Sequence, residues 1–303
     1  MSKITILGVG NVGATIAYAL TINGVASHIV LLDINKNKAE GEALDIHQGI
    51  IYCPTVDIYS GDYADAADSD IVIVTLGIGR KPGQTRIDLA QTNVNIIKEA
   101  IPQVLKYAPN AIYVVVSNPV DVITYTMIKR LGIPKNRVLS TGTMLDTARL
   151  RSILSKQLNI SAKDIHAYVL GEHGDTSVIP WSLATIAGMP ATQFKQFDTQ
   201  QIDIDTRTAG AKIISLKGAT YYAIALAVLK VCTSILRDTG TTLTVSTLIE
   251  GQYGIEDVAM SLPFLVNSKG IDRALIPPLN DKELIALHNS AHFIKETLNS
   301  LDI

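Results

Sequence analysis

The first half of the chain alternates short apolar runs with amphipathic stretches. Six runs, several of them apolar throughout and rich in β-branched residues, predict strands at residues 3–7, 29–33, 57–60, 71–75, 112–117 and 137–140. Apolar strands of this kind are typical of parallel sheets that are covered on both faces. Helices are predicted between them, at residues 12–21, 36–47, 88–107 and 121–131. This strand–helix rhythm predicts an α/β fold with a doubly wound parallel sheet.

The pattern changes near residue 143. Helices are predicted at residues 147–158, 205–236 and 281–301, and strands at residues 165–170, 242–248 and 261–266. We therefore expect two domains, at residues 1–142 and 143–303, the second with an α+β fold. Because no long linker separates them, the two domains are expected to pack closely together.

Composition narrows the class of protein. Hydrophobic residues make up 47% of the chain and charged residues 18%, which is typical of globular proteins. The net charge is −2 with no basic block, so no nucleic-acid partner is expected. No apolar run reaches membrane-spanning length and no signal peptide precedes the first strand, so we expect a cytoplasmic protein. Cys53 and Cys232 lack the spacing of a metal or redox site and are expected to be buried thiols.

Residues 8–13, with the sequence GVGNVG, match the G-x-G-x-x-G pattern through Gly8, Gly10 and Gly13. The motif follows a predicted strand and opens a predicted helix, where glycines allow a tight turn and let the backbone approach a pyrophosphate. Asp33 stands 20 residues after Gly13, at the end of the second strand, where a carboxylate can bind both ribose hydroxyls. A 2′-phosphate would be repelled there, so the motif predicts a Rossmann domain that binds NAD rather than NADP.

His173 lies between glycines in the segment GEHGD, directly after a predicted strand. Glycine neighbours let a ligand come close, so this histidine is not expected to be a core residue. Asp146 and Arg149 lie near the start of a predicted helix, where they could serve as a helix cap and a surface cation. Alternatively, Asp146 orients His173 and raises its pKa, so that the imidazolium donates a proton to a substrate oxygen. Arg149 would then bind a substrate carboxylate through two parallel hydrogen bonds.

Five motifs resemble those of the lactate/malate dehydrogenase family, and the resemblance covers nearly the whole chain. They are ILGVGNVG (6–13), SNPVD (117–121), LDTAR (145–149), GEHGD (171–175) and KGAT (217–220). The resemblance implies that His173 is the proton donor and acceptor, that Asp146 is its partner and that Arg149 binds the substrate carboxylate. It also implies that Asn118 contacts both the substrate oxygen and the nicotinamide. Further NAD contacts are implied at Val12, Lys38, Tyr63, Gly77, Ser117 and Thr141.

The resemblance also implies a mobile loop at residues 77–86. Its glycines suit hinge motion. Arg86 corresponds to the loop arginine that closes over the reacting carbonyl and polarises it, and the expulsion of water strengthens this effect. Without the resemblance, the segment would be interpreted as a solvated basic loop.

The sequence leaves several 2-hydroxy acids open as substrates. Arg80 stands at the loop position where malate enzymes of the family have arginine and lactate enzymes commonly have glutamine. Glu172 and Thr220, in contrast, fit the lactate-type substrate pocket. Residues 75–77 and 122–124 are similar to those of 2-hydroxyisocaproate dehydrogenases. We predict NAD-dependent reduction of pyruvate to L-lactate, with malate dehydrogenation or a broader L-2-hydroxyacid activity as alternatives.

Arg151 and His166 match the residues with which bacterial lactate dehydrogenases bind fructose 1,6-bisphosphate between subunits. They are otherwise interpreted as a surface arginine and a half-buried strand histidine. The match implies an allosteric homo-oligomer, a tetramer or a dimer, that acts in pyruvate fermentation after glycolysis.

Two other classes of protein share parts of this pattern. A non-catalytic nucleotide sensor can have the same fold, because fold alone does not determine function. An NAD-dependent glycosidase of related fold would need a metal, and the sequence contains no convincing cysteine–histidine ligand set, so no metal site is predicted.

Overall fold

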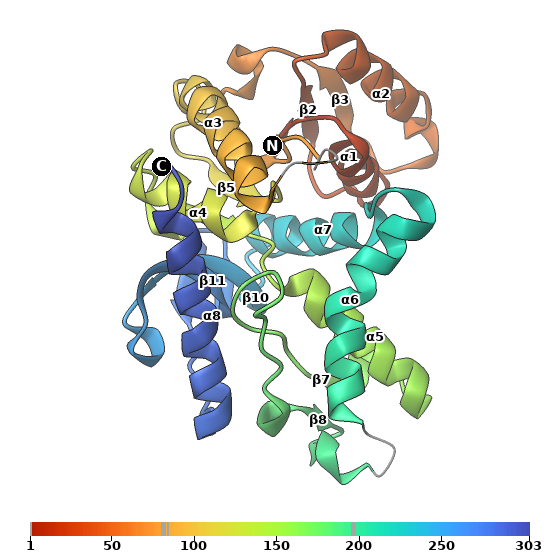
Figure 1. Ribbon diagram of the computed structural model, residues 1–303. Coiled ribbons are helices and arrows are strands. Elements are labelled where there is room, and N and C mark those ends of the chain that lie inside the picture. Colours follow the sequence, from red (N-terminus) through yellow and green to blue (C-terminus); the bar gives the residue numbers. More distant parts are fainter. Residues whose placement is uncertain (1, 80–82, 84, 195–197) are drawn as a thin grey trace.

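Nine strands form one mixed sheet in the computed structural model, which describes residues 2–79, 83, 85–194 and 198–303 (Figure 1). They run in the order β12-β11-β10-β6-β5-β4-β1-β2-β3. The strands are β1 (Lys3–Leu7), β2 (His28–Leu32), β3 (Asp57–Ser60), β4 (Ile71–Val74), β5 (Ile112–Val115), β6 (Val138–Ser140), β10 (Thr241–Glu250), β11 (Glu256–Asn267) and β12 (Gly270–Ala274). The helices are α1 (Asn11–Asn23), α2 (Lys36–Gln48), α3 (Arg86–Leu105), α4 (Val120–Lys129), α5 (Met144–Leu158), α6 (Thr199–Lys217), α7 (Tyr222–Leu236) and α8 (Asp281–Asn299).

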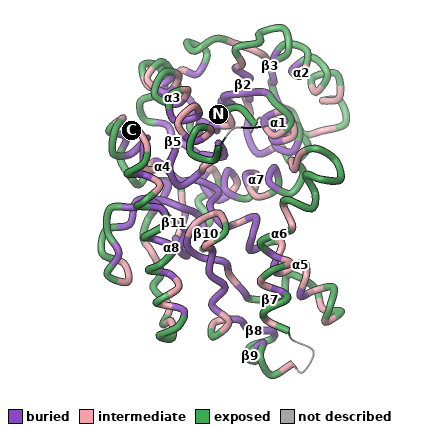
Figure 2. Tube along the Cα trace, viewed as in Figure 1, coloured by how far each residue is buried: buried purple, intermediate pink, exposed green. Residues whose placement is uncertain are grey.

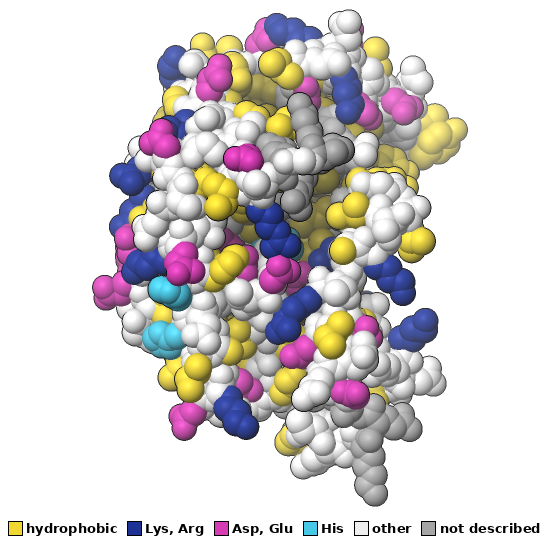
Figure 3. Space-filling model, viewed as in Figure 1, with side chains coloured by type: hydrophobic (Ala, Val, Ile, Leu, Met, Phe, Trp, Pro, Cys, Tyr) yellow, Lys and Arg dark blue, Asp and Glu magenta, His cyan; other side chains and the backbone are white. Residues whose placement is uncertain are grey.

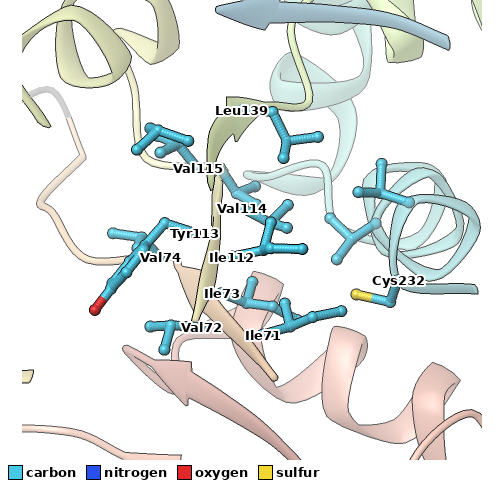
Figure 4. Close-up of a cluster of buried hydrophobic side chains, with 14 of the residues drawn as sticks. Ile71, Val72, Ile73, Val74, Ile112, Tyr113, Val114, Val115, Leu139 and Cys232 are labelled. Carbon is cyan, nitrogen blue, oxygen red and sulfur yellow. The ribbon is translucent and has the colours of Figure 1, made fainter. Parts of the chain in front are cut away.

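Strands β1 to β6 are parallel, which confirms the predicted doubly wound sheet. Strands β4 and β5 are buried along their whole length, and Figure 4 shows their side chains pointing to both sides of the sheet. Ile71 and Ile73 point toward Cys232 of α7, whereas Val72 and Tyr113 point the other way. The strand order reverses between β1 and β4, and in such sheets ligands bind at the carboxyl ends of the strands beside the reversal.

The strands of the second half extend this sheet, which the sequence pattern did not predict. Strand β10 pairs antiparallel with β6 through Ser246 and Ser140, and β11 pairs along β10. Both strands are also longer than the predicted residues 242–248 and 261–266. The sheet therefore continues from one half of the chain into the other through this pair.

The predicted helix at residues 205–236 is wrong, because the structure contains two helices there. Helix α6 ends at Lys217, and Gly218 has a φ of 85°, a conformation that glycine adopts without strain. Helix α7 begins at Tyr222. Apolar residues on both sides of the break continue a helical pattern, so the periodicity did not reveal it.

The predicted strand at residues 165–170 is shorter than expected. Strand β7 contains Ile165–His166, and it pairs with β8 (Thr185–Ile186), which pairs with β9 (Met189–Pro190). The chain then continues as an irregular segment, in which Leu170 bridges to Val178.

Burial follows the central sheet, and the exposed positions lie mainly on the outer helices and loops (Figure 2). Cys232 is buried, and burial raises the pKa of its thiol to about 12. Cys53 is only partly buried, so the expectation of two buried thiols is wrong for Cys53; both cysteines are free. Within the described ranges, no helix combines the length and the apolar composition needed to cross a membrane.

Candidate active site

His173 and Asp146 form a direct pair. Nδ1 of His173 lies 2.6 Å from Oδ2 of Asp146, and the two side chains are 24% and 11% exposed. Asp146 is the third residue of α5 and Thr143 stands at the N-cap position, so Asp146 is not the helix cap. Its position near the start of the helix directs the carboxylate toward the segment that carries His173.

The pair has the electrostatics of an acid–base site. Burial alone would lower the pKa of His173, but the charge and hydrogen bond of Asp146, together with the charge of Asp121, raise the pKa above its usual value. Burial alone would raise the pKa of Asp146, yet His173 and Arg149 hold it below its usual value. The protonated imidazole is therefore stabilised by a carboxylate that stays ionised.

Arg149 lies on the other side of the same carboxylate. Its Nη1 donates to Oδ1 of Asp146 at 2.9 Å, so Asp146 bridges the guanidinium and the imidazole. Gly210 of α6 passes close by, and a Cβ there would lie 3.0 Å from Nη2 of Arg149. Gly210 makes room for the guanidinium, and no motif in the sequence revealed this role.

Arg86 lies at the edge of the same region. It is the first residue of α3, and its Nη1 donates to Oδ2 of Asp175 at 2.7 Å, two residues after His173. The arginine side chain is 68% exposed, and such surface pairs contribute little and break easily. On the face of the molecule that Figure 3 displays, Lys or Arg side chains lie close to Asp or Glu side chains near the middle. Arg80, the predicted specificity residue, lies outside the described residues.

Asn93 links two predicted site segments, and sequence reasoning missed it. Asn93 is 2% exposed on α3. Its Oδ1 accepts from the backbone N–H of Ile78 at 2.9 Å, and its Nδ2 donates to the carbonyl of Asn118 at 2.8 Å. A Cβ on Gly77 would meet this amide at 3.0 Å. Asn93 therefore ties the start of the loop at residue 77 to the backbone of Asn118.

The glycine motif forms a close turn between β1 and α1. Gly8 has a φ of 90°, and a Cβ on Gly13 would overlap the carbonyl oxygen of Gly8. At Gly10, by contrast, nothing lies within 4 Å of the Cβ position. The carboxylate of Asp33 accepts backbone N–H groups of Val9 at 2.6 Å and Asn35 at 2.9 Å, which holds it beside this turn. The tight turn, the open space at Gly10 and the fixed carboxylate fit a dinucleotide.

The other predicted cofactor residues surround the carboxyl ends of the strands. Gly77 follows β4, Ser117 and Asn118 follow β5, and Thr141 follows β6. The hydroxyl of Ser117 donates to the carbonyl of Val74, which ties the ends of β4 and β5 together. Val12 is half-buried in α1, and the two remaining residues lie further out on the surface: Lys38 in the first turn of α2 and Tyr63 at the start of the 3-10 helix Tyr63–Ala66.

The residues predicted to select the substrate have different surroundings. Thr220 is half-buried in the turn between α6 and α7. The carboxylate of Glu172 accepts the backbone N–H and the hydroxyl of Thr176, so it stabilises the turn after His173.

Arg151 lies on α5 and His166 on β7, two elements that pack against each other. Nε of Arg151 donates to the carbonyl of Ala167 at 3.0 Å, and its guanidinium lies 5.3 Å from the ring centre of Tyr168. His166 is exposed in β7. Arg151 is thus held against the two residues that follow His166.

A doubly wound sheet with a dinucleotide turn and an adjacent imidazole–carboxylate pair defines an NAD-dependent dehydrogenase. Residues 2–140 match the NAD-binding domain of lactate/malate dehydrogenases, and residues 143–302 match their α/β C-terminal domain. The chain belongs to the lactate/malate dehydrogenase family, and its cofactor is NAD.

Proteins named L-lactate dehydrogenase are similar to the chain over its full length. The protein of Acetivibrio thermocellus is 46% identical over 311 residues, covering 100% of this chain and 98% of that protein. L-lactate dehydrogenase 1 of Clostridium acetobutylicum is 46% identical, covering 99% of this chain and 98% of its own length. Among solved structures, the minor L-lactate dehydrogenase from Enterococcus mundtii superposes with a TM-score of 0.96 at 36% identity, covering 99% of this chain and 98% of that one.

Proposed function

We propose that the chain is an NAD-dependent L-lactate dehydrogenase that reduces pyruvate to L-lactate. The observation that carries the proposal is the contact series from His173 through Asp146 to Arg149, which combines a raised imidazole pKa with a cation for a carboxylate. The proposed division is that residues 1–142 bind the cofactor and residues 143–303 supply the substrate-binding and catalytic groups.

The cofactor site uses the turn of Gly8, Gly10 and Gly13 for the pyrophosphate and Asp33 for the adenosine ribose. When bound, NADH supplies the hydride that the carbonyl carbon of the substrate accepts. Ser117, Asn118 and the residues at the other strand ends would position the nicotinamide. Asn93 supports this arrangement, because it holds the backbone of Asn118.

The protein side of the reaction rests on three side chains. Arg149 would bind the carboxylate of the 2-oxo acid, and Arg86 would leave Asp175 to polarise the carbonyl as the loop closes. Protonated His173 donates its proton to the carbonyl oxygen, and Asp146 stabilises the imidazolium beforehand. The reverse reaction needs neutral His173 as the base.

Malate dehydrogenation is the second candidate, because Arg80 suits the second carboxylate of oxaloacetate. Glu172, Thr220 and the similarity to proteins named L-lactate dehydrogenase favour pyruvate. A broader L-2-hydroxyacid activity is the third alternative.

The proposal includes assembly and regulation. Exposed apolar side chains gather where α1 packs against α7: Tyr18 and Ile22 on α1, and Tyr222 and Leu226 on α7. Other exposed apolar side chains lie on and just after α2 and near the end of α6, at the right-hand edge of Figure 3. Such a surface suits a homo-oligomer, a dimer or a tetramer. Arg151 and His166 would bind fructose 1,6-bisphosphate between subunits, in an allosteric cytoplasmic enzyme of pyruvate fermentation after glycolysis.

Steady-state kinetics with pyruvate, oxaloacetate and 2-oxoisocaproate, each with and without fructose 1,6-bisphosphate, test the proposal. We expect the highest kcat/KM with pyruvate. A kcat/KM about a hundredfold higher for oxaloacetate, equivalent to about 2.7 kcal/mol, would overturn it. His173→Ala should reduce turnover by several orders of magnitude while NADH still binds, whereas His288→Ala, at an exposed position on α8, should behave like the unmodified protein.

A further inference from the structure

The segment that carries His173 is anchored by three consecutive backbone N–H groups, each to a different element. Gly171 donates to the carbonyl of Ser261 on β11, Glu172 donates to the hydroxyl of Ser290 on α8, and His173 donates to Oδ2 of Asp121 on α4. The three distances are 2.9, 2.8 and 2.9 Å. The neutral acceptors at Ser261 and Ser290 satisfy their donors, so an anchoring bond alone does not require a carboxylate at the third position.

Asp121 is unusual because its carboxyl is buried. It is 4% exposed in the first turn of α4, three residues after Asn118. Burial raises its pKa to about 6, against the opposing effects of the Ser246 hydroxyl, the backbone N–H of His173 and the imidazole. Burying a carboxylate is costly unless its charge is compensated, which points to a use for the charge.

The imidazolium of His173 offsets part of this cost, because its charge lowers the pKa of Asp121, although burial has the larger effect. Asp146 on α5 and Asp121 on α4 both raise the pKa of His173, and Arg149 lowers it. Glu172 is the further charged group that acts on Asp121. Two carboxylates on different helices therefore face one histidine, one at the ring nitrogen and the other at the backbone.

We propose that Asp121 is a positioning residue for His173. Its carboxylate accepts a hydrogen bond from the backbone of the histidine, and its negative charge stabilises the protonated imidazole. The proposal rests on the proposed reaction in that it takes His173 as the acid and base. The two aspartates then have different roles. Asp146 orients the imidazole ring, and Asp121 orients the segment that carries His173 and adds negative charge.

Asp121→Asn separates charge from anchoring, because the amide oxygen can still accept the N–H of His173. We expect the pH midpoint of pyruvate reduction to move to lower pH by about one unit. At pH 7.5, kcat/KM for pyruvate should fall several-fold, while kcat/KM for lactate oxidation should hold or rise, since oxidation needs the neutral imidazole. A general loss of structure would lower both directions together.

Ser290→Ala is the matched control, because it removes the acceptor of the neighbouring Glu172 N–H without changing charge. Its turnover can fall, but its pH midpoints should equal those of the unmodified protein. Asp121→Leu removes both the acceptor and the charge, and it should lower kcat in both directions by at least about tenfold. An Asp121→Asn variant with unchanged pH midpoints would overturn the proposal.

Histidine NMR titration of the same variants without substrate separates this proposal from the proposed function. The midpoint for His173 should be lower in Asp121→Asn than in the unmodified protein and unchanged in Ser290→Ala. The NMR titration does not need turnover. A protein inactive with pyruvate would therefore refute the proposed function, while the titration would still show whether Asp121 affects His173. An identical His173 midpoint in all three proteins would refute the role of Asp121.

Discussion

At the scale of single residues, the chemistry depends on how burial and charge compete at His173. Burial disfavours the imidazolium, but the carboxylates of Asp146, at 2.6 Å, and of Asp121 together raise the pKa of His173 above its usual value. The raised pKa favours the imidazolium, which can donate a proton to a substrate oxygen. The same carboxylate holds Arg149, so the acid and the substrate-binding cation are positioned together.

The raised pKa predicts opposite pH trends for the two directions of the reaction. Pyruvate reduction requires the imidazolium, so kcat/KM should fall as pH rises through the raised pKa of His173, whereas lactate oxidation should increase over the same interval. Asp146→Asn should move both profiles to lower pH, because it removes the main group that raises the pKa. Asp57→Asn, beside the partly exposed His28, is the control and should leave both profiles unchanged. Rates that stay flat from about pH 5 to 9 in both directions would contradict the assignment of His173.

At the scale of elements, the site depends on the strand ends and the first turns of helices. The β1–α1 turn, the start of α3 and the first turns of α4 and α5 supply Gly8, Arg86, Asp121 and Asp146. Side chains at these positions are held by rigid elements yet lie at an edge of the sheet. This explains why the site residues, which are spread along the chain, come together.

Substitutions in the glycine turn should separate folding from cofactor binding. Gly13→Ala places a Cβ on the carbonyl oxygen of Gly8, so it should destabilise the protein by about 3 kcal/mol or more, measured by urea denaturation. Gly10→Ala meets no protein atom, so stability should change little while NADH affinity falls, measured by fluorescence titration. Gly41→Ala, in an open position of α2, should change neither quantity for the worse. Equal stability of the Gly13 and Gly10 variants would contradict this view of the turn.

Asn93→Ala should weaken catalysis indirectly, because Asn93 holds the backbone of two site segments. The substitution leaves the N–H of Ile78 and the carbonyl of Asn118 without the side-chain partner that holds both segments beside α3. We expect kcat/KM for pyruvate to fall about tenfold or more. Asn95→Ala removes an exposed amide on the same helix and should stay within about twofold of the unmodified protein. Equal kinetics for the two variants would show that Asn93 does not support the site.

At the scale of the whole molecule, one sheet joins both halves of the chain. Pairing of β10 with β6 ties the second half to the parallel strands, while α5 and the segment of His173 lie beside this junction. The groups expected to bind the cofactor and the groups expected to react with the substrate are therefore held in one frame.

The apolar surface of α1 and α7 predicts self-association. Leu226→Glu introduces a charge on this surface, so the protein should sediment as a smaller species than the unmodified chain. Ile285→Glu changes an exposed apolar residue on α8 and should leave the sedimentation coefficient unchanged. If the unmodified protein already sediments as a monomer at micromolar concentration, the surface does not serve this purpose.

The apolar runs and the glycine motif were enough to predict the parallel sheet, because periodicity and turn chemistry are local properties. Asp33 could be named from its spacing after the glycine motif, and His173, Asp146 and Arg149 because each stands in a short motif. Asn93 and Gly210 could not be found, since their roles arise from contacts with residues distant in the sequence. The break between α6 and α7 also escaped prediction, because the helical pattern continues across it.

The sequence by itself determined the class of fold and the residue types of the site, since strand patterns and short motifs need no knowledge of distant partners. Tertiary structure alone decided how burial and charge balance at His173, because the pKa depends on Asp146 and Asp121, which reach it from two helices distant in the sequence. It also decided that β10, β11 and β12 extend the main sheet, because strand pairing between distant segments leaves no local signal in the chain.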